Sequence, residues 1–255
     1  MLSVLNMVWN YLDSGANPGR FNMMLDETIA GKVASGESPS VLRFYRWQPY
    51  CISLGKYQKI EEIDRDKCQR EGIDIVYRPT GGRAILHAEE LTYSVIFKDE
   101  IAGTIDETYC RISRALVMGL VKMGVPAQMA PVQADFRTLY KQPSSAACFS
   151  SSAKYEIQVH GKKLVGSAQR RFAGAVLQHG SILIGSHHRR LTEFLRLTDE
   201  EKKKMAAILE EKTIEIEQIR SIDADELKAE LKKAFVESFG VTFKAPEPDL
   251  VSSVV

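Results

Sequence analysis

The stretch YRPTGGRAILHAEELTYSV, residues 77–95, carries the strongest local signals in the chain. The β-branched run at 73–77 and the apolar run at 91–97 each predict a strand. Residues 78–84 contain a proline and a pair of glycines, so they are predicted to form a loop between these strands. The stretch is therefore interpreted as a strand, a loop and a return strand.

The loop itself has the residue types of a binding site. Gly81 and Gly82 let the backbone take positive φ or approach a ligand closely. Arg78 and Arg83 flank the glycines and His87 follows them, whereas an ordinary turn needs neither two arginines nor a histidine. The loop lacks the Gly-Lys-Ser/Thr of a phosphate-binding P-loop and does not match GxGxxG. We therefore interpret it as a ligand-binding loop that is neither of these.

The segments on either side predict a mixture of helices and hairpins. Apolar residues at helical spacing predict helices over 21–35, 105–123, 199–209 and 224–239. A β-hairpin is predicted over 155–169, with its turn at His160-Gly161. Because strands and helices do not alternate one to one, we expect an α+β fold with mixed, largely antiparallel β-sheets flanked by helices. Residues 198–240 are a helical, Lys/Glu-rich C-terminal portion, and 246–255 are expected to be a flexible tail.

Length and charge narrow the function classes. The chain has 255 residues, which suits one large domain, and it contains 34 basic and 33 acidic residues. This balance gives no electrostatic basis for nucleic-acid binding, because phosphate contacts need an excess of basic residues. No run approaches the roughly 20 apolar residues that span a membrane, and the first residues lack the features of a signal peptide. We therefore expect a cytoplasmic protein with reduced thiols that binds neither nucleic acid nor membranes.

The four cysteines form no CxxC pair, which argues against a zinc ribbon or a thioredoxin-like motif. Cys51, Cys68 and Cys110 fall in a predicted strand or helix, where a cysteine usually serves only for packing. Cys148 differs because it lies in the long aperiodic segment 135–152, among small and polar residues. An accessible thiol is expected in such a loop.

A second polar segment is GKKLVGSAQ, residues 161–169. Its Lys163 is followed by the small residues Gly166, Ser167 and Ala168 on the same predicted strand. Small residues in a strand indicate that another backbone or a ligand packs closely against it. We therefore treat Lys163 as a candidate site residue.

The histidines His179, His187 and His188 are not predicted to bind a metal, because their spacing lacks a carboxylate partner. His187 and His188 precede two arginines and are expected in an exposed loop. The sequence therefore predicts no metal site.

Together these segments resemble the lipoate/biotin protein ligase superfamily and, within it, the octanoyltransferases of the LipM type. The resemblance rests on residues 77–95, on ACFSSSAKYEI (147–157), on GKKLVGSAQRR (161–171), on LQHGSILI (177–184) and on SLGKYQ (53–58). It covers roughly residues 20–240. It implies the biotin/lipoate protein ligase catalytic-domain fold as a single domain over residues 20–245, with 198–240 as a helical extension.

The resemblance also implies roles for individual residues. Cys148 takes the place of the acyl-thioester nucleophile, and Lys163 takes the place of the lysine that contacts the acyl carbonyl and lowers the thiol pKa. Residues of two segments are implied to bind the acyl group: Arg78, Gly81, Gly82, Arg83, His87, Gly166, Ser167 and Ala168. The family reaction moves an octanoyl group from octanoyl-acyl carrier protein to one lysine of a lipoyl domain, characteristically the glycine cleavage system H protein. It needs no cofactor.

One position departs from the family pattern. Many relatives have an acidic residue directly after the loop histidine, whereas here Ala88 follows, with Glu89 and Glu90 next. The resemblance therefore leaves open which local carboxylate, if any, takes over that role.

The implied chemistry is physically consistent. A free cysteine has a pKa of about 8.5, so only a few per cent is thiolate at pH 7. The ammonium of Lys163 beside Cys148 would raise that fraction, and a strand out and back brings two such residues together. Exchange between thioesters is nearly balanced in energy, so loading the cysteine needs no ATP. Transfer to a lysine amine then gives an amide and is strongly downhill.

Three alternatives stay open at this point. An ATP-dependent lipoate–protein ligase on the same fold would need magnesium and no cysteine, but Arg83 stands where ligases usually have a third glycine. An amidotransferase between lipoyl domains would carry a different sequence around the cysteine. A binding module without turnover predicts that Cys148 and Lys163 are dispensable. None of the four hypotheses requires more than a monomer.

Overall fold

The structure is a computed structural model, and it describes residues 7–130 and 156–252. Its main sheet has eight strands in the order β11-β1-β2-β6-β10-β9-β8-β7 among the described residues. These strands are β1 (Met7–Asn17), β2 (Val41–Trp47), β6 (Glu90–Lys98), β7 (Gln128–Met129), β8 (Ile157–Val159), β9 (Lys162–Phe172), β10 (Ala175–Leu183) and β11 (Val241–Lys244). Strand β1 pairs in parallel with β2 and β11, and the other pairs of this sheet are antiparallel.

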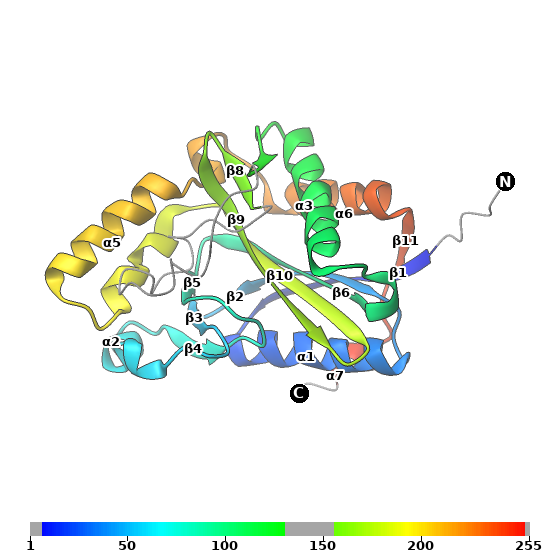
Figure 1. Ribbon diagram of the computed structural model, residues 1–255, viewed down its shortest axis with the longest axis horizontal. Helices are drawn as coiled ribbons and strands as arrows, with labels where there is room; N and C mark the ends of the chain where they lie inside the picture. The colour runs from blue at the N-terminus through cyan, green and yellow to red at the C-terminus, as the bar shows by residue number, and fades with distance from the viewer. Residues whose placement is uncertain (1–6, 131–155, 253–255) are drawn as a thin grey trace.

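A smaller sheet has the order β4-β3-β5 and packs beside the main one. It consists of β3 (Cys51–Leu54), β4 (Asp74–Tyr77) and β5 (Ile85–His87). Strand β3 runs parallel to β4 and antiparallel to β5. The loop 78–84 connects β4 to β5, as the sequence predicts, and it lies near β10 in Figure 1.

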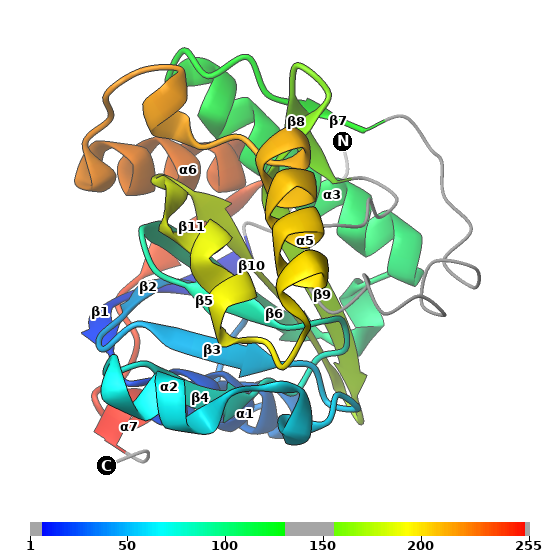
Figure 2. The same cartoon turned by 90° about the vertical axis from the view of Figure 1, so that its left-hand side faces the viewer.

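Helices cover both faces of the main sheet (Figures 1 and 2). The helices are α1 (Gly19–Ser35), α2 (Arg65–Arg70), α3 (Ile105–Lys122), α5 (Asp199–Lys212), α6 (Ala224–Phe239) and α7 (Asp249–Ser252). Short 3₁₀ segments are η1 (Ile60–Glu62), η2 (Asp99–Ile101), η5 (Ser186–Phe194) and η6 (Ile216–Gln218). Helices α3 and α6 lie on one face, and α1 and α7 lie on the other. The expected α+β class with mixed, largely antiparallel sheets is confirmed.

The core follows from the two-residue period of the strands. On β2, Leu42 and Phe44 join the large cluster under α3 and α6, whereas Val41 joins the cluster under α1. Helix α3 begins with a capping box, because the Thr104 hydroxyl accepts from the N–H of Glu107 and the Glu107 carboxylate accepts from the N–H of Thr104. Its apolar face then packs on α6, so the C-terminal helices share one core with the sheet.

Two boundaries differ from the sequence expectations. Strand β1, ahead of residue 20, lies inside the main sheet and so belongs to the folded unit. The tail expected to be flexible from 246 is ordered up to residue 252, because it forms α7 and buries Leu250 in the α1 cluster. An apolar side chain that finds a place in a core outweighs the polar composition around it.

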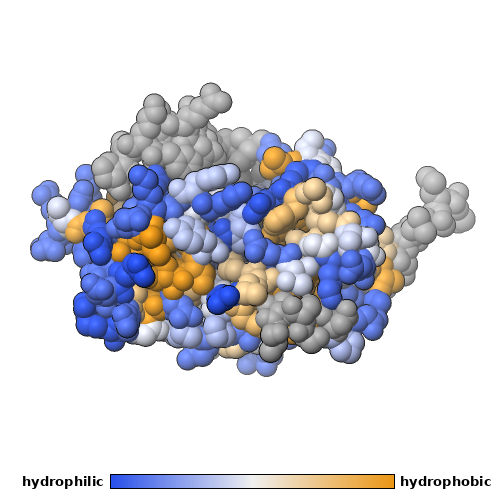
Figure 3. Space-filling view, turned by 90° about the horizontal axis from the view of Figure 1, so that it is seen from below, coloured by the Kyte–Doolittle hydropathy of each residue, from blue (hydrophilic) through white to orange (hydrophobic). Residues whose placement is uncertain are grey.

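The surface seen from below carries an apolar patch among hydrophilic residues, toward the end of the molecule where α2 and β4 lie (Figure 3). Strand β4 is an outer strand of the small sheet, and its Ile75 and Val76 are half-buried. Within residues 7–130 and 156–252, no helix combines the length and the apolar composition needed to cross a membrane.

Candidate active site

A cavity of about 380 Å³, part of it open to solvent, lies where the small sheet meets β9 and β10. Its apolar wall consists of Met23, Tyr45, Trp47, Ile85 and Ala168. Its polar wall consists of Ser53, Arg78, His87, Thr92, Ser167, His179 and Ser181, and Gly166 and Gly180 complete the lining. The cavity therefore brings the predicted loop and the predicted small-residue strand to one place.

Arg78 holds the loop that borders the cavity. Its guanidinium is buried and donates to the carbonyl and the hydroxyl of Ser53, at 2.8 and 3.0 Å. It also donates to the carbonyl oxygens of Gly81 and Arg83, at 2.9 and 2.7 Å. The loop is pressed against Gly55, since a Cβ there would lie 2.0 Å from the Gly82 carbonyl oxygen. Arg78 thus organises the loop as well as lining the cavity.

His87 stacks on Trp47, with ring centroids 4.0 Å apart and an interplanar angle of 13°. Its Nδ1 lies 2.8 Å from Oε1 of Glu90, and its Nε2 lies 2.7 Å from the Ser53 hydroxyl. The same Glu90 oxygen accepts from Thr92 and Ser181. Of the two glutamates that follow the loop histidine, Glu90 is therefore the one that contacts it directly, whereas Glu89 is exposed.

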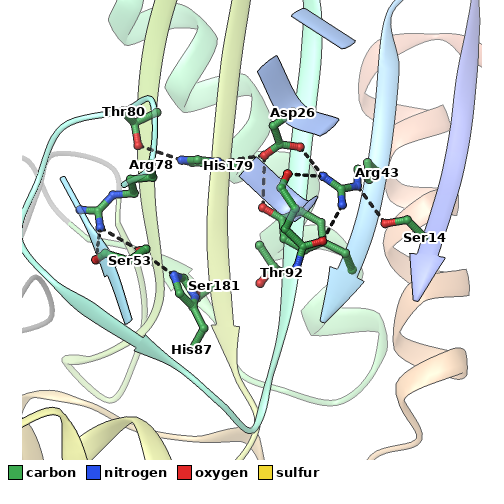
Figure 4. A network of polar contacts seen from close by, with 12 residues as sticks. Ser14, Asp26, Arg43, Ser53, Arg78, Thr80, His87, Thr92, His179 and Ser181 are labelled. Atoms are coloured by element: carbon green, nitrogen blue, oxygen red, sulfur yellow. Dashed lines mark hydrogen bonds and ion pairs between the residues drawn. The ribbon is translucent and has the colours of Figure 1, made fainter. Parts of the chain in front are cut away.

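A second histidine, His179 on β10, faces the cavity from the main sheet (Figure 4). Its Nδ1 lies 3.1 Å from Oδ2 of Asp26 on α1, and its Nε2 lies 2.8 Å from the Thr80 hydroxyl. Asp26 in turn forms a fully buried ion pair with Arg43 at 2.7 Å. The phenol of Tyr45 donates to the same carboxylate, at 3.2 Å.

Many polar groups of the cavity wall thus bond to one another. The Trp47 indole N–H donates to Thr92, whose hydroxyl donates to Glu90. Tyr45 is likewise bonded to Asp26. These polar atoms already have partners, and His87 stacks on one face of Trp47 while Arg43 lies over one face of Tyr45. The remaining surface of the two rings and the side chains of Met23 and Ile85 are therefore what the apolar wall offers for contact. A wall of this kind suits an alkyl chain better than a polar ligand.

The predicted acyl-binding residues are only partly collected at the cavity. Gly166, Ser167 and Ala168 line it together with Arg78 and His87. The close packing expected on this strand is present, because a Cβ at Gly180 of β10 would lie 2.5 Å from the Gly166 carbonyl oxygen. The other three predicted residues are not part of its lining. They are the exposed Gly81 and Gly82 and the half-buried Arg83.

Lys163 lies at the start of β9 and is 3% exposed. Its Nζ lies 2.5 Å from Oε1 of the buried Glu156, and its carbonyl accepts from the N–H of Ile214. A bulge in β9 separates Lys163 from Val165, since these residues pair with the adjacent Gln158 and Ile157 of β8. Lys163 does not line the cavity. Cys148 lies outside the described residues.

Cys51 and Cys68 are buried, as expected for cysteines that serve for packing. Burial, and next the charge of Asp74, raise the pKa of the Cys51 thiol well above its ordinary value. Burial raises the pKa of Cys68 to about 11. Both thiols therefore stay protonated at neutral pH, whereas Cys110 on α3 is half-buried.

Two histidine interpretations change. His187 and His188 do not lie in an exposed loop but in the 3₁₀ segment η5, where His188 is buried against Thr213. From the sequence, His179 is weighed only as a metal ligand, whereas the structure places it in the cavity wall. A signal existed, because His179 and Ser181 share one face of a strand whose other residues are mostly apolar. Among the described residues, no group of three or more His, Cys, Asp or Glu side chains could hold a metal ion.

Comparison with known proteins identifies the family. Residues 18–236 match the family model of the lipoyl protein ligase A/B catalytic domain. An octanoyltransferase LipM of Exiguobacterium sp. is 37% identical over 243 residues, which are 92% of this chain and 88% of that protein. An octanoyltransferase LipM of Symbiobacterium thermophilum is 44% identical over 193 residues, which are 75% of this chain and 70% of that protein.

The fold is also found in solved structures. A bipartite lipoate protein ligase from Thermoplasma acidophilum, described together with its E2 lipoyl domain, superposes with a TM-score of 0.79 at 22% identity. The match covers 98% of this chain and 91% of that one. The chain is therefore a member of the lipoyl protein ligase A/B catalytic-domain family, and within that family it is of the LipM type.

Proposed function

We propose that this protein transfers an octanoyl group from octanoyl-acyl carrier protein, through a thioester on Cys148, to one lysine of a lipoyl domain. The glycine cleavage system H protein is the acceptor that we expect. The observation that carries the proposal is the cavity, since its apolar wall and mutually bonded polar groups suit an unsubstituted alkyl chain. The names of the curated relatives support the octanoyl group.

The energetics of the cavity agree with this substrate. Burying one CH₂ group stabilises a complex by about 0.8 kcal/mol. An octanoyl chain laid against Trp47, Tyr45 and Met23 therefore gains several kcal/mol from burial. That gain is available in the thioester and in the transition state alike, so the chain contributes mainly to binding.

The chemical step needs a nucleophile, a charge to activate it and donors for the oxyanion. The Cys148 thiolate attacks the thioester carbonyl and expels the carrier protein's thiolate, which takes up a proton. The acceptor lysine amine then attacks the new thioester, an amide forms, and the amine proton leaves with the Cys148 sulfur as a thiol. Thioester exchange is nearly balanced in energy and amide formation from a thioester is downhill, so neither step needs ATP.

Lys163 is the residue that we assign to activation of the thiol. Its Nζ is buried and forms an ion pair with the carboxylate of Glu156 at 2.5 Å. Glu156 follows directly on the segment that contains Cys148 in the sequence. A buried cation near a thiol favours the thiolate.

The oxyanion donors that we propose are Lys163 and the backbone N–H groups of Gly81 and Gly82. Within residues 7–130 and 156–252, neither glycine N–H donates to an acceptor. Gly82 also has a positive φ of 97°, which turns the peptide in a way that side-chain-bearing residues rarely adopt. Donors of this kind stabilise the charge that develops on the carbonyl oxygen during acyl transfer.

Intact-mass measurement after mixing the protein with octanoyl-acyl carrier protein, without ATP, tests the proposal. We expect an adduct of one octanoyl group that hydroxylamine removes. The adduct should be absent in Cys148→Ala and present in Cys110→Ala, the matched control on the half-buried Cys110.

Two outcomes would contradict the transfer reaction. If the wild type stays unmodified but acylates a lipoyl domain from free acid plus ATP, the protein is a ligase. If it carries out neither reaction, it is a binding module. An unchanged alkylation pH profile of Cys148 in Lys163→Ala would remove Lys163 from the activating role.

A further inference from the structure

We infer that His179 is a positioning residue that fixes the acyl-binding loop, residues 78–84, through its bond to Thr80, with Asp26 holding the imidazole in the required tautomer. The inference rests on the proposed function for its meaning in catalysis. It rests on the structure alone for its geometry, which joins α1, β10 and the loop (Figure 4).

Asp26 is the fixed end of this chain of contacts. It is fully buried, and burial alone would raise its pKa, but Arg43 and His179 outweigh that effect and bring the pKa below its ordinary value. Arg43 is itself held by Asn22 at 2.7 Å and by Ser14 at 2.9 Å. The carboxylate is therefore ionised, anchored and able only to accept hydrogen bonds.

His179 is consequently held in one tautomer. Burial lowers the pKa of its ring, although the neighbouring Asp26 acts in the opposite direction. The ring is neutral at pH 7, so it carries one proton. Because the Asp26 carboxylate accepts at 3.1 Å, that proton is on Nδ1 and leaves Nε2 as an acceptor. The Thr80 hydroxyl, 2.8 Å away, therefore donates to Nε2.

The Thr80 bond connects two separate sheets. Thr80 lies in the loop between β4 and β5 of the small sheet, whereas His179 lies on β10 of the main sheet. The neighbouring Pro79 is held through its carbonyl by Arg170 at 3.0 Å, and the Thr80 carbonyl accepts from the N–H of Lys56 at 2.9 Å. Thr80 is thus held through its side chain as well as its backbone, and the glycine pair starts directly after it.

The consequence is specific to the hydroxyl of Thr80. Thr80→Val keeps the shape of the side chain but leaves the buried Nε2 of His179 without its donor, whereas Thr80→Ser keeps the donor. Losing one bond to a buried polar group costs about tenfold in an equilibrium or a rate. We expect the loop to loosen in Thr80→Val, and the position of the Gly81 and Gly82 N–H groups to become less well defined.

The experiment compares Thr80→Val, Thr80→Ser and the wild type, with Thr108→Val as the matched control. Thr108 is also a buried threonine, its hydroxyl donates to the Ala102 carbonyl, and it does not line the cavity. Hydrogen exchange of the peptides that cover 78–84 should become about tenfold faster in Thr80→Val only. The rate constant for loading from octanoyl-acyl carrier protein should fall about tenfold in Thr80→Val and recover in Thr80→Ser.

A third readout is the nitrogen NMR spectrum of His179, which should report a proton on Nδ1 in the wild type. Equal loss of loading in Thr80→Val and Thr80→Ser would overturn the inference, because the methyl and not the hydroxyl would then matter. Unchanged exchange of the loop in Thr80→Val, or a proton on Nε2 of wild-type His179, would also overturn it. If the wild type is never acylated, the proposed function fails, and the exchange and NMR results still decide the role of His179.

Discussion

Two buried histidines, His179 on the cavity wall and His188 in η5, have neighbours of the same residue types but differ in how their rings are held. Both rings are buried, both contact a threonine hydroxyl, and both have a carboxylate nearby. At His179 the carboxylate of Asp26 sits on Nδ1 at 3.1 Å, within hydrogen-bond reach. At His188 the carboxylate of Glu215 lies 3.6 Å from Nε2, and Nδ1 faces a backbone carbonyl at 3.4 Å.

The difference lies in how each carboxylate is compensated. Arg43, the partner of Asp26, is completely buried, whereas the Arg189 side chain that pairs with Glu215 is 22% exposed. The first cluster is closed to water and fixes one proton position, whereas the second contacts solvent through the Arg189 side chain, although His188 and Glu215 are themselves buried. The closed cluster of Asp26, Arg43 and His179 holds the cavity wall in place. The cluster of Glu215, Arg189 and His188 holds the segment after α5 against η5.

The largest expected effect comes from breaking the closed cluster. Arg43→Met should cost about 3–5 kcal/mol of unfolding free energy, because it leaves the Asp26 carboxylate buried without a cation. Arg189→Met should cost less, about 2 kcal/mol, because it also leaves a buried carboxylate, Glu215, but on a pair whose arginine side chain is 22% exposed. Urea unfolding of both variants measures the two losses. Equal losses would show that the clusters do not differ in the way described.

The second effect concerns pH and is specific to His188. Burial lowers the pKa of His188 to about 4, so the folded ring holds its proton less tightly than the unfolded one. The stability that belongs to the neutral ring is present above the ordinary pKa of about 6.5 and is lost as pH falls toward 4. One pKa unit corresponds to about 1.4 kcal/mol, so this loss is on the order of 3 kcal/mol.

The variant His188→Gln should lack that part of the pH dependence, while starting from a lower stability at pH 7. Unfolding free energies measured at several pH values between 7.5 and 4 give the two slopes. An identical slope in the variant and the wild type would contradict a neutral, buried His188.

A third prediction probes the steric side of the loop position. Gly55→Ala places a Cβ 2.0 Å from the Gly82 carbonyl oxygen, so the loop must move, at a cost of about 1–3 kcal/mol. Gly81→Ala meets nothing within 4 Å and should change the stability by less than about 0.5 kcal/mol. Thermal unfolding distinguishes the two. A stable Gly55→Ala variant would mean that the loop is not pressed against β3 in solution.

The smallest expected effect lies on the surface near His188. Arg190 of η5 pairs with Glu71 and Glu193, at 2.7 and 2.8 Å, but its side chain is 38% exposed. Arg190→Gln should therefore cost less than about 1 kcal/mol at low salt. The difference from the wild type should disappear at about 1 M salt, where charges a few ångströms apart are screened. If Arg190→Gln still lowers the unfolding free energy at about 1 M salt, the Arg190 ion pairs are shielded from solvent like the Arg43–Asp26 pair.

Much of the fold was accessible from local sequence patterns. The helix predicted over 105–123 is α3, because its apolar stripe and Gly124 are local signals. The hairpin predicted over 155–169 corresponds to β8 and β9. The expectation of a flexible tail over 246–255 did not foresee α7, because this helix is too short to show helical periodicity. Its strongest signal in the sequence is Leu250, which is buried.

Part of the candidate site could also be predicted from local sequence patterns. Arg78, His87 and Gly166 belong to short motifs whose composition is unusual by itself, and the structure places all three at the cavity. Asp26 and His179 are 153 positions apart, so no spacing rule connects them. A contact of that kind depends on how α1 packs on the sheet, and this is decided by the whole core. The roles of Cys148 and Lys163 stay predictions that the acylation experiment tests.

The parallel pairing of β1 with β11 affects how a growing chain reaches this fold. Trp9 on β1 packs against Phe239 and Phe243, with ring centroids 5.0 and 6.4 Å apart, and both partners come near the other end of the described chain. During synthesis, the hydrogen bonds between β1 and β11 and the contacts of Trp9 with Phe239 and Phe243 cannot form until residues 239–244 have left the ribosome. A nascent chain of this protein therefore carries an unpaired, apolar strand edge for most of its translation, the kind of surface that chaperones bind and that aggregates when they do not.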